Sequence, residues 1–307
     1  MFTSMKKIFA FMIAVAAWMA GNGQTDTSRK AQDSLVTVSL TDTLELHTDS
    51  FQVSKPERKG SVYKIKPAID LPIIAAGTAW SLYGFSQIYN KPSSPEARIL
   101  SLRKSDINGF DRAAADNYDE GADKTSDALF YGSMPVPVLF MLLDGKVRKD
   151  FGKVFLVWWE TMAVTGIYYT GSAHLIDRYR PLAYNSAAPM HERTSGNAKN
   201  SFIGGHPALV GSMTFFVAKV YSDYHPDSKA KWVFYTAATA ATVTTAYLRY
   251  KAGKHFPSDL VAGSILGPLT GILVPHFHKN KQFKDANLSI RPYSGASHGL
   301  ILTYRFK

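Results

Sequence analysis

The chain has 307 residues, no cysteine and a formal net charge of +11 at pH 7. Without cysteine, neither a disulfide framework nor thiol redox chemistry is available, and the N-terminal leader is not that of a bacterial lipoprotein, which needs a cysteine at its cleavage site. The positive charge suits an anionic ligand or an acidic membrane surface. Because lysine and arginine are scattered among long apolar segments and no nucleic-acid motif appears, we expect no nucleic-acid partner.

Residues 1–24 have the pattern of a secretory signal peptide. Lys6 and Lys7 precede an apolar run over residues 8–20, which is shorter than a membrane span. An uncleaved membrane anchor is the alternative. Residues 25–66 are rich in Ser, Thr, Asp and Lys and poor in large apolar side chains, which predicts a flexible polar arm.

Apolar segments between residues 67 and 284 predict an all-α, six-helix up-and-down bundle. The predicted helices cover residues 71–89, 127–143, 154–176, 207–221, 232–249 and 259–276. A charged connection, residues 90–124, joins the first two helices. We interpret its acidic residues 116–123 as a solvated helix face, because their spacing does not follow a known calcium loop.

Residues 285–307 predict a C-terminal β-hairpin. Two runs of strand-forming residues, 287–293 and 299–306, flank the turn-forming sequence Ser-Gly-Ala-Ser. An uncovered strand edge would allow this hairpin to pack on the bundle or to pair with another chain.

Hydropathy alone allows either a membrane-embedded bundle or a soluble one. Several predicted helices are near the length of a membrane span, but Thr, Ser and Gly dilute their apolar character. Glu160, inside the third helix, sharpens the question. A carboxylate inside a bilayer is costly and is therefore paired or functional, whereas in a soluble bundle it can reach water.

Three polar clusters lie at ends of the predicted helices, and an up-and-down bundle brings these ends to one face. The clusters are Arg180-Pro181, Gly204-Gly205-His206 and the set Arg249, His255 and Asp259. Guanidinium groups match the geometry of phosphate, and imidazole serves as a nucleophile or a proton carrier. Each cluster alone also fits an ordinary helix end or loop. All three in this order predict a site for attack on phosphorus.

The clusters resemble the motifs of the type 2 phosphatidic acid phosphatase and vanadium haloperoxidase superfamily, in particular its membrane-associated bacterial lipid phosphatases. That family carries K-x6-R-P, P-S-G-H and S-R-x5-H-x3-D, and the likeness covers about residues 171–263. Four family positions differ, since Ala173 replaces the Lys, Ile203-Gly204 the Pro-Ser pair and Leu248 the Ser. The missing cation has four possible replacements nearby: Arg178, Lys199, Lys251 and Lys254.

The resemblance implies a phosphatase that needs neither a metal nor another cofactor and that works through a phosphohistidine. His255 would attack phosphorus, and Asp259 would orient its ring. His206 would protonate the leaving oxygen and then activate water.

By the same resemblance, Arg180 and Arg249 would hold the phosphoryl oxygens. Gly204 and Gly205 would offer backbone N–H groups to an oxyanion, since a residue without Cβ permits close approach.

The resemblance further implies a phosphorylated lipid as substrate, a membrane as partner, and a place in the cell envelope with the site facing the periplasm. Which lipid is used, and the oligomeric state, are not evident from these residues. Two alternatives stay open: an envelope protein that binds phosphorylated lipid without cleaving it, as Ala173 and Gly204 suggest, and a vanadate-dependent haloperoxidase.

Overall fold

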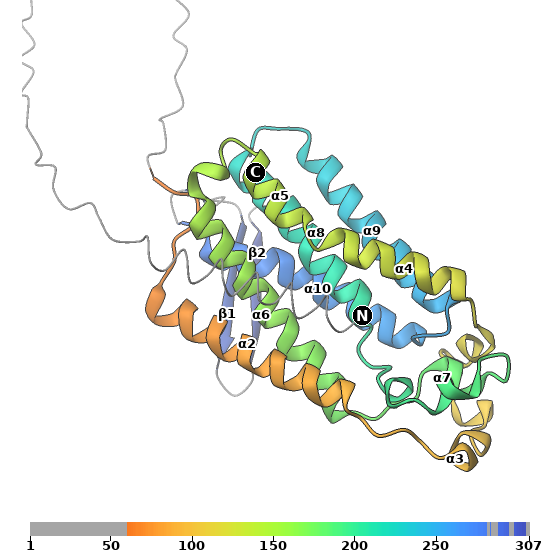
Figure 1. Cartoon of the computed structure of the whole chain (residues 1–307). Coiled ribbons are helices and arrows are strands. Elements are labelled where there is room, and N and C mark those ends of the chain that lie inside the picture. Colours follow the sequence, from red (N-terminus) through yellow and green to blue (C-terminus); the bar gives the residue numbers. More distant parts are fainter. Residues whose placement is uncertain (1–59, 281–282, 284–287, 295–297, 305–307) are drawn as a thin grey trace, which may run out of the picture. The chain divides into compact units, whose positions relative to one another are not determined.

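The computed structural model describes residues 60–280, 283, 288–294 and 298–304 (Figure 1). The predicted signal peptide and most of the predicted polar arm lie outside the described residues. Those two segments, and the boundaries drawn between the four predicted regions, stay predictions.

Helices dominate residues 60–280. The longer helices are α2 (Pro67–Tyr89), α4 (Glu120–Ser133), α5 (Val136–Leu143), α6 (Phe151–Leu175), α8 (Gly205–Tyr224), α9 (Lys231–Lys251) and α10 (Pro257–His278). The connections contain two short helices, α3 (Glu96–Leu100) and α7 (Met190–Thr194). They also contain 3-10 turns at Lys104–Asp106, Arg112–Asp116, Arg148–Asp150, Pro181–Tyr184 and Gly196–Lys199.

The second predicted helix differs from the structure in two ways. It is divided into α4 and α5 near Pro135, which has no N–H to donate to the preceding turn. Helix α4 also starts at Glu120 rather than Asp127. Oδ1 of Asp119 accepts a hydrogen bond from the backbone N–H of Ala122 at 2.9 Å, and this cap begins the helix within the charged connection.

Close packing between α8 and α10 fixes the segments that carry the two histidines of the predicted site. Helix α2 lies along α6, and α8 contacts both α9 and α10 (Figure 1). A Cβ atom on Gly267 would lie 2.2 Å from the backbone oxygen of Ala208, and one on Gly211 would lie 2.6 Å from Cδ of Pro268. The two helices therefore touch through their backbones.

Two helical segments among the described residues are long and apolar enough to cross a membrane. They are Glu120–Leu143 and Pro257–His278, with mean hydropathies of 1.4 and 1.6. Core helices of soluble proteins have the same length and composition, so integral insertion stays a prediction.

The described C-terminal residues form two strands, β1 (Leu288–Ser294) and β2 (His298–Tyr304). The strands pair antiparallel, with Leu288 opposite Tyr304 and Ser294 opposite His298. They occupy the runs in which the sequence predicts a hairpin.

Candidate active site

Four of the predicted site residues lie close enough together for their charges to shift one another's pKa values. Arg180 precedes the turn Pro181–Tyr184, His206 is the second residue of α8, and Arg249 is in the last turn of α9. His255 stands two residues before α10. The charges of Arg180 and Arg249 lower the pKa of both histidines, although burial is the larger cause in each case.

The ring of His255 is held by a backbone carbonyl. Its Nδ1 lies 2.6 Å from the backbone oxygen of Ser201. A carbonyl only accepts, so Nδ1 carries the hydrogen, and the neutral ring keeps its lone pair on Nε2. His255 is 2% exposed, and burial, followed by Arg180 and Arg249, holds its pKa well below the usual 6.5. At neutral pH the ring is therefore uncharged, with a lone pair on Nε2.

Asp259 reaches this ring only indirectly, which corrects the predicted direct contact. Its Oδ2 accepts from Oγ of Ser201 at 2.6 Å and from the backbone N–H of Phe256 at 2.9 Å. The carboxylate thus fixes the residue whose carbonyl holds the ring and the residue that follows His255. It positions His255 through its two neighbours.

Arg178 is already engaged in holding the same loops. It pairs with Asp259 and, through Nη2 at 2.7 Å, with the fully buried Asp111. Its guanidinium lies 4.7 Å from the centre of the Phe256 ring. Of the four basic residues that could replace the family's Lys, Arg178 therefore has a structural task.

Arg180 is a buried cation with unused hydrogen-bond donors. It is 7% exposed, its Nη2 donates to Oδ1 of Asn197 at 3.2 Å, and its Nε has no hydrogen-bond partner. Among the described residues, no carboxylate lies within ion-pair distance of it. Burial, and then the charge of Arg249, lower its pKa to about 10, so it stays protonated at neutral pH.

Arg249 differs from Arg180 because α4 supplies carboxylates to it. Its Nη1 lies 2.6 Å from Oδ1 of Asp123 and 3.2 Å from Oδ1 of Asp127. Its Nε is nevertheless buried without a partner, like that of Arg180. A buried N–H group without an acceptor is costly, so the Nε–H groups of Arg180 and Arg249 are available to bind an anion.

His206 is bound by the same helix. Its Nε2 lies 2.8 Å from Oδ1 of Asp127, and its ring lies against that of Phe130, with 4.5 Å between the ring centres. Since an ionised carboxylate only accepts, Nε2 carries a hydrogen. Burial, followed by the charge of Arg249, lowers the pKa of His206 to about 4.

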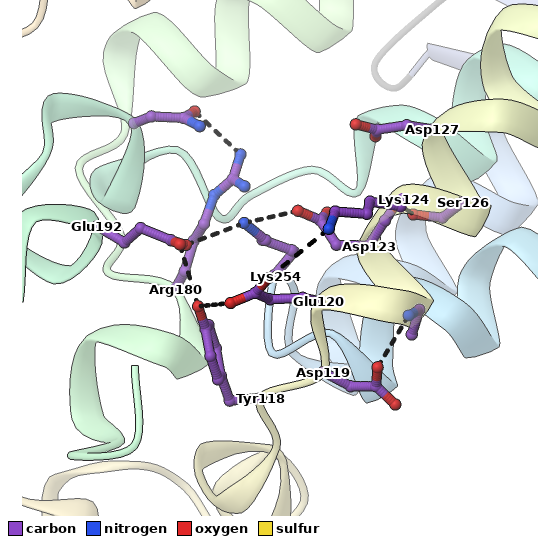
Figure 2. A network of polar contacts seen from close by, with 12 residues as sticks. Tyr118, Asp119, Glu120, Asp123, Lys124, Ser126, Asp127, Arg180, Glu192 and Lys254 are labelled. Atoms are coloured by element: carbon purple, nitrogen blue, oxygen red, sulfur yellow. Dashed lines mark hydrogen bonds and ion pairs between the residues drawn. The ribbon is translucent and has the colours of Figure 1, made fainter. Parts of the chain in front are cut away.

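Of the four basic residues that could replace the family's Lys, Lys254 pairs with a carboxylate that also binds Arg249. Its Nζ is 3.0 Å from Oδ2 of Asp123 and 3.4 Å from Oε2 of Glu192, and Figure 2 shows it between these two carboxylates. Because Asp123 also pairs with Arg249, Lys254 and Arg249 share one carboxylate.

The two glycines of the second cluster are closely packed, and the N–H group of Gly204 already has a partner. The N–H of Gly204 donates to the backbone oxygen of Asp259 at 3.0 Å, so the predicted oxyanion contact by Gly204 does not fit. Gly205 opens α8, where the first N–H groups have no partner within the helix. A Cβ atom on Gly205 would lie 2.3 Å from the ring of Tyr169.

Asp123, Asp127 and Ser201 belong to the site but lie outside the sequence motifs. Residues 116–123 are not a solvated face throughout, because Asp123 and Asp127, four residues apart on one face of α4, both lie within ion-pair distance of Arg249. That spacing was a signal, but only for a helix known to begin at Glu120. Ser201 acts through its carbonyl, which no side-chain motif reveals.

Residues 155–283 match the family model described as the PAP2 superfamily. This part of the chain is a PAP2 domain. It runs from within α6 through α10 and includes every predicted site residue, whereas α4 precedes it.

No curated protein matches the chain. A solved structure described as the first transmembrane PAP2 type phosphatidylglycerolphosphate phosphatase from Bacillus subtilis is similar at 16% sequence identity, with a TM-score of 0.32. The similarity covers 68% of this chain and 92% of that one.

Proposed function

We propose that the PAP2 domain is a phosphatase that hydrolyses the phosphate of a phosphorylated lipid. The observation that carries the proposal is the buried guanidinium of Arg180, which has no carboxylate partner among the described residues and lies close to the neutral His255. Burying an unpaired cation is costly, so the site is built for an anion. Phosphate fits because guanidinium bonds to two of its oxygens at once.

The proposed reaction has two displacements. Nε2 of His255 attacks phosphorus, the P–N bond forms, and the P–O bond to the lipid breaks as His206 gives a proton to the leaving oxygen. A water molecule then attacks phosphorus with His206 as base, and the P–N bond breaks. Arg180 and Arg249 stabilise the charge on the phosphoryl oxygens in both steps.

The low pKa of His206 fits this order of events. In the described state the ring is neutral, because burial and Arg249 disfavour its charged form. A phosphate dianion between Arg180 and Arg249 would offset their charges and raise that pKa. His206 would therefore gain its proton when substrate binds, and the N–H bond to Asp127 would favour the charged ring.

Lys254 is proposed to supply the cation that the family places at the position of Ala173. Ala173 is 1% exposed in α6, and its methyl group offers no charge. Lys254 directly precedes His255, and its Nζ pairs with the carboxylate of Asp123, which also pairs with Arg249. Exchange of Asp123 for a phosphoryl oxygen would turn both cations toward substrate.

A lipid substrate is supported by the apolar exterior. Helix α9 exposes large apolar side chains, including Trp232 at 67%, Val243 at 58% and Tyr247 at 58%. Exposed apolar surface of this kind marks contact with a membrane or a partner. We propose membrane association in the cell envelope, with chemistry on the periplasmic side.

The test compares wild type with His255→Ala in mild detergent. Phosphate release would be followed from a panel of phosphorylated lipids and a soluble aryl phosphate, with and without chelator. We expect release by wild type in both conditions and none by the variant. Full activity of the folded variant would overturn the assignment of the nucleophile.

A second candidate, an envelope protein that binds phosphorylated lipid without hydrolysis, is favoured by Ala173 and by the occupied N–H of Gly204. If folded wild type releases no phosphate from any substrate but binds vesicles that contain phosphorylated lipid, the binding protein would be supported instead.

A further inference from the structure

Three buried metal-ligating side chains meet at the end of α10 remote from His255. Asp70 comes from the first turn of α2, Glu160 from α6, and His278 is the last residue of α10. They are 4%, 7% and 9% exposed. Nε2 of His278 lies 3.2 Å from Oε2 of Glu160 and 3.4 Å from Oδ2 of Asp70, and all three ligand atoms lie within 4.8 Å of one another.

The hydrogen bond on the other side of the ring shows which nitrogen faces the carboxylates. Nδ1 of His278 lies 2.8 Å from the backbone oxygen of Val274. Since that oxygen only accepts, Nδ1 carries the hydrogen, and in the neutral ring Nε2 presents a lone pair to Asp70 and Glu160. Three acceptors facing one another repel unless a cation joins them.

A proton on Nε2 meets this need only in part. With an imidazolium, two carboxylates would still leave one buried negative charge, and His278 is the only basic side chain within ion-pair distance of either among the described residues. Oε2 of Glu160 is buried and receives no hydrogen bond from any described residue. A divalent cation would neutralise both carboxylates with the ring neutral.

The spacing also fits a metal ion. In tetrahedral zinc sites the bonds to nitrogen and oxygen place neighbouring ligand atoms about 3.3 Å apart. The two distances from Nε2 of His278, 3.2 Å and 3.4 Å, lie on either side of this value. A metal-bound imidazole commonly donates its other N–H to a backbone carbonyl, as His278 does to Val274.

We propose that Asp70, Glu160 and His278 bind one divalent transition-metal ion, zinc by geometry, which ties α2, α6 and α10 together. The ion has a structural task. Helix α10 has 22 residues, so its ends lie roughly 33 Å apart, and the metal takes no part in chemistry at His255. A bound cation also accounts for the carboxylate of Glu160 within the largely apolar helix α6.

The test measures metal bound by the full chain. Wild type would be incubated with zinc sulfate, desalted and analysed by mass spectrometry for about one zinc per chain. We expect Glu160→Gln and His278→Gln to lose at least four fifths of it. His225→Gln is the matched control, because His225 pairs with Asp144 at 2.7 Å outside the trio. It should keep its zinc.

Two further readouts guard against misfolded variants. Wild type loaded with Co²⁺ should show the visible absorption of a tetrahedral site, and chelator should lower the melting temperature of wild type by several degrees. Folded wild type that retains no zinc and melts unchanged with chelator would overturn the proposal, and so would Glu160→Gln that retains as much zinc as wild type.

Discussion

The carbonyl of Ser201 does at His255 what the sequence assigns to Asp259. The carboxylate of Asp259 holds Oγ of Ser201 at 2.6 Å, and the carbonyl of Ser201 holds Nδ1 of His255 at 2.6 Å. A carbonyl keeps the tautomer with the lone pair on Nε2 whatever the charge at Asp259. A direct contact of Asp259 with the ring and the observed contact of the Ser201 carbonyl therefore predict different losses of activity for Asp259→Asn.

Asp259→Asn should lower kcat by roughly tenfold to a hundredfold and leave KM nearly unchanged. An Asn that replaces a carboxylate in direct contact with the ring favours the wrong tautomer and costs about 10⁴-fold in the best-studied histidine sites. Here the carbonyl still fixes the tautomer, while the contacts of Asp259 with Ser201, Phe256 and Arg178 weaken. Steady-state phosphate release measures this.

Ser201→Ala is the companion variant, since it removes the hydroxyl contact and keeps the carbonyl. It should show a loss no larger than that of Asp259→Asn. A loss near 10⁴-fold for Asp259→Asn with a nearly normal Ser201→Ala would show that Asp259 touches the ring during turnover.

Sequence patterns predict the long helices where the apolar runs are continuous. They fail for the start of helix α4, whose first residues are mostly polar. Helix α10 begins at Pro257 because Pro favours the first helical position, and this signal is visible in the sequence. Helix α4 begins at Glu120 after its cap residue Asp119, in polar sequence where no apolar run marks a helix start. Its register, and with it the direction of Asp123 and Asp127, comes from packing against α8 and α9.

The backbone contact between α8 and α10 leaves no room for a methyl group. Gly267→Ala would place Cβ 2.2 Å from the backbone oxygen of Ala208, and a backbone cannot rotate away as a side chain does. We expect a loss of about 1–3 kcal/mol in the free energy of unfolding. Denaturant titration in detergent measures it.

Gly132→Ala is the control, because nothing lies within 4 Å of a Cβ atom there and Gly132 is in α4. Removing a glycine from a helix should stabilise the protein by up to about 1 kcal/mol. Equal effects of the two substitutions would show that α8 and α10 are not in backbone contact in solution.

The stability of the whole described molecule depends on pH through the partly buried, neutral His206. The pKa of His206 falls from 6.5 to about 4 in the folded state, through burial and then Arg249. The unfolded chain therefore binds this proton first as the solution is acidified. Stability from His206 is complete above pH 6.5 and is lost as pH falls toward 4.

We expect the free energy of unfolding of wild type to drop between pH 6.5 and pH 4. His206→Gln should remove up to about 3 kcal/mol of that drop, because the shift corresponds to that free energy. Denaturant titrations at both pH values measure the difference. Identical pH dependence in the two proteins would mean that His206 is solvated and titrates normally.

The pairing of Arg249 with Asp123 and Asp127 has a consequence for product release. When an anion leaves, both carboxylates can pair with the guanidinium of Arg249 again, since Asp123 and Asp127 lie 2.6 Å and 3.2 Å from its Nη1. Free inorganic phosphate would have to compete with them without help, whereas the proposed lipid substrate would be kept at high local concentration by its apolar tail. Liberated phosphate should therefore be a weak inhibitor, and the enzyme would keep turning over as phosphate accumulates around it.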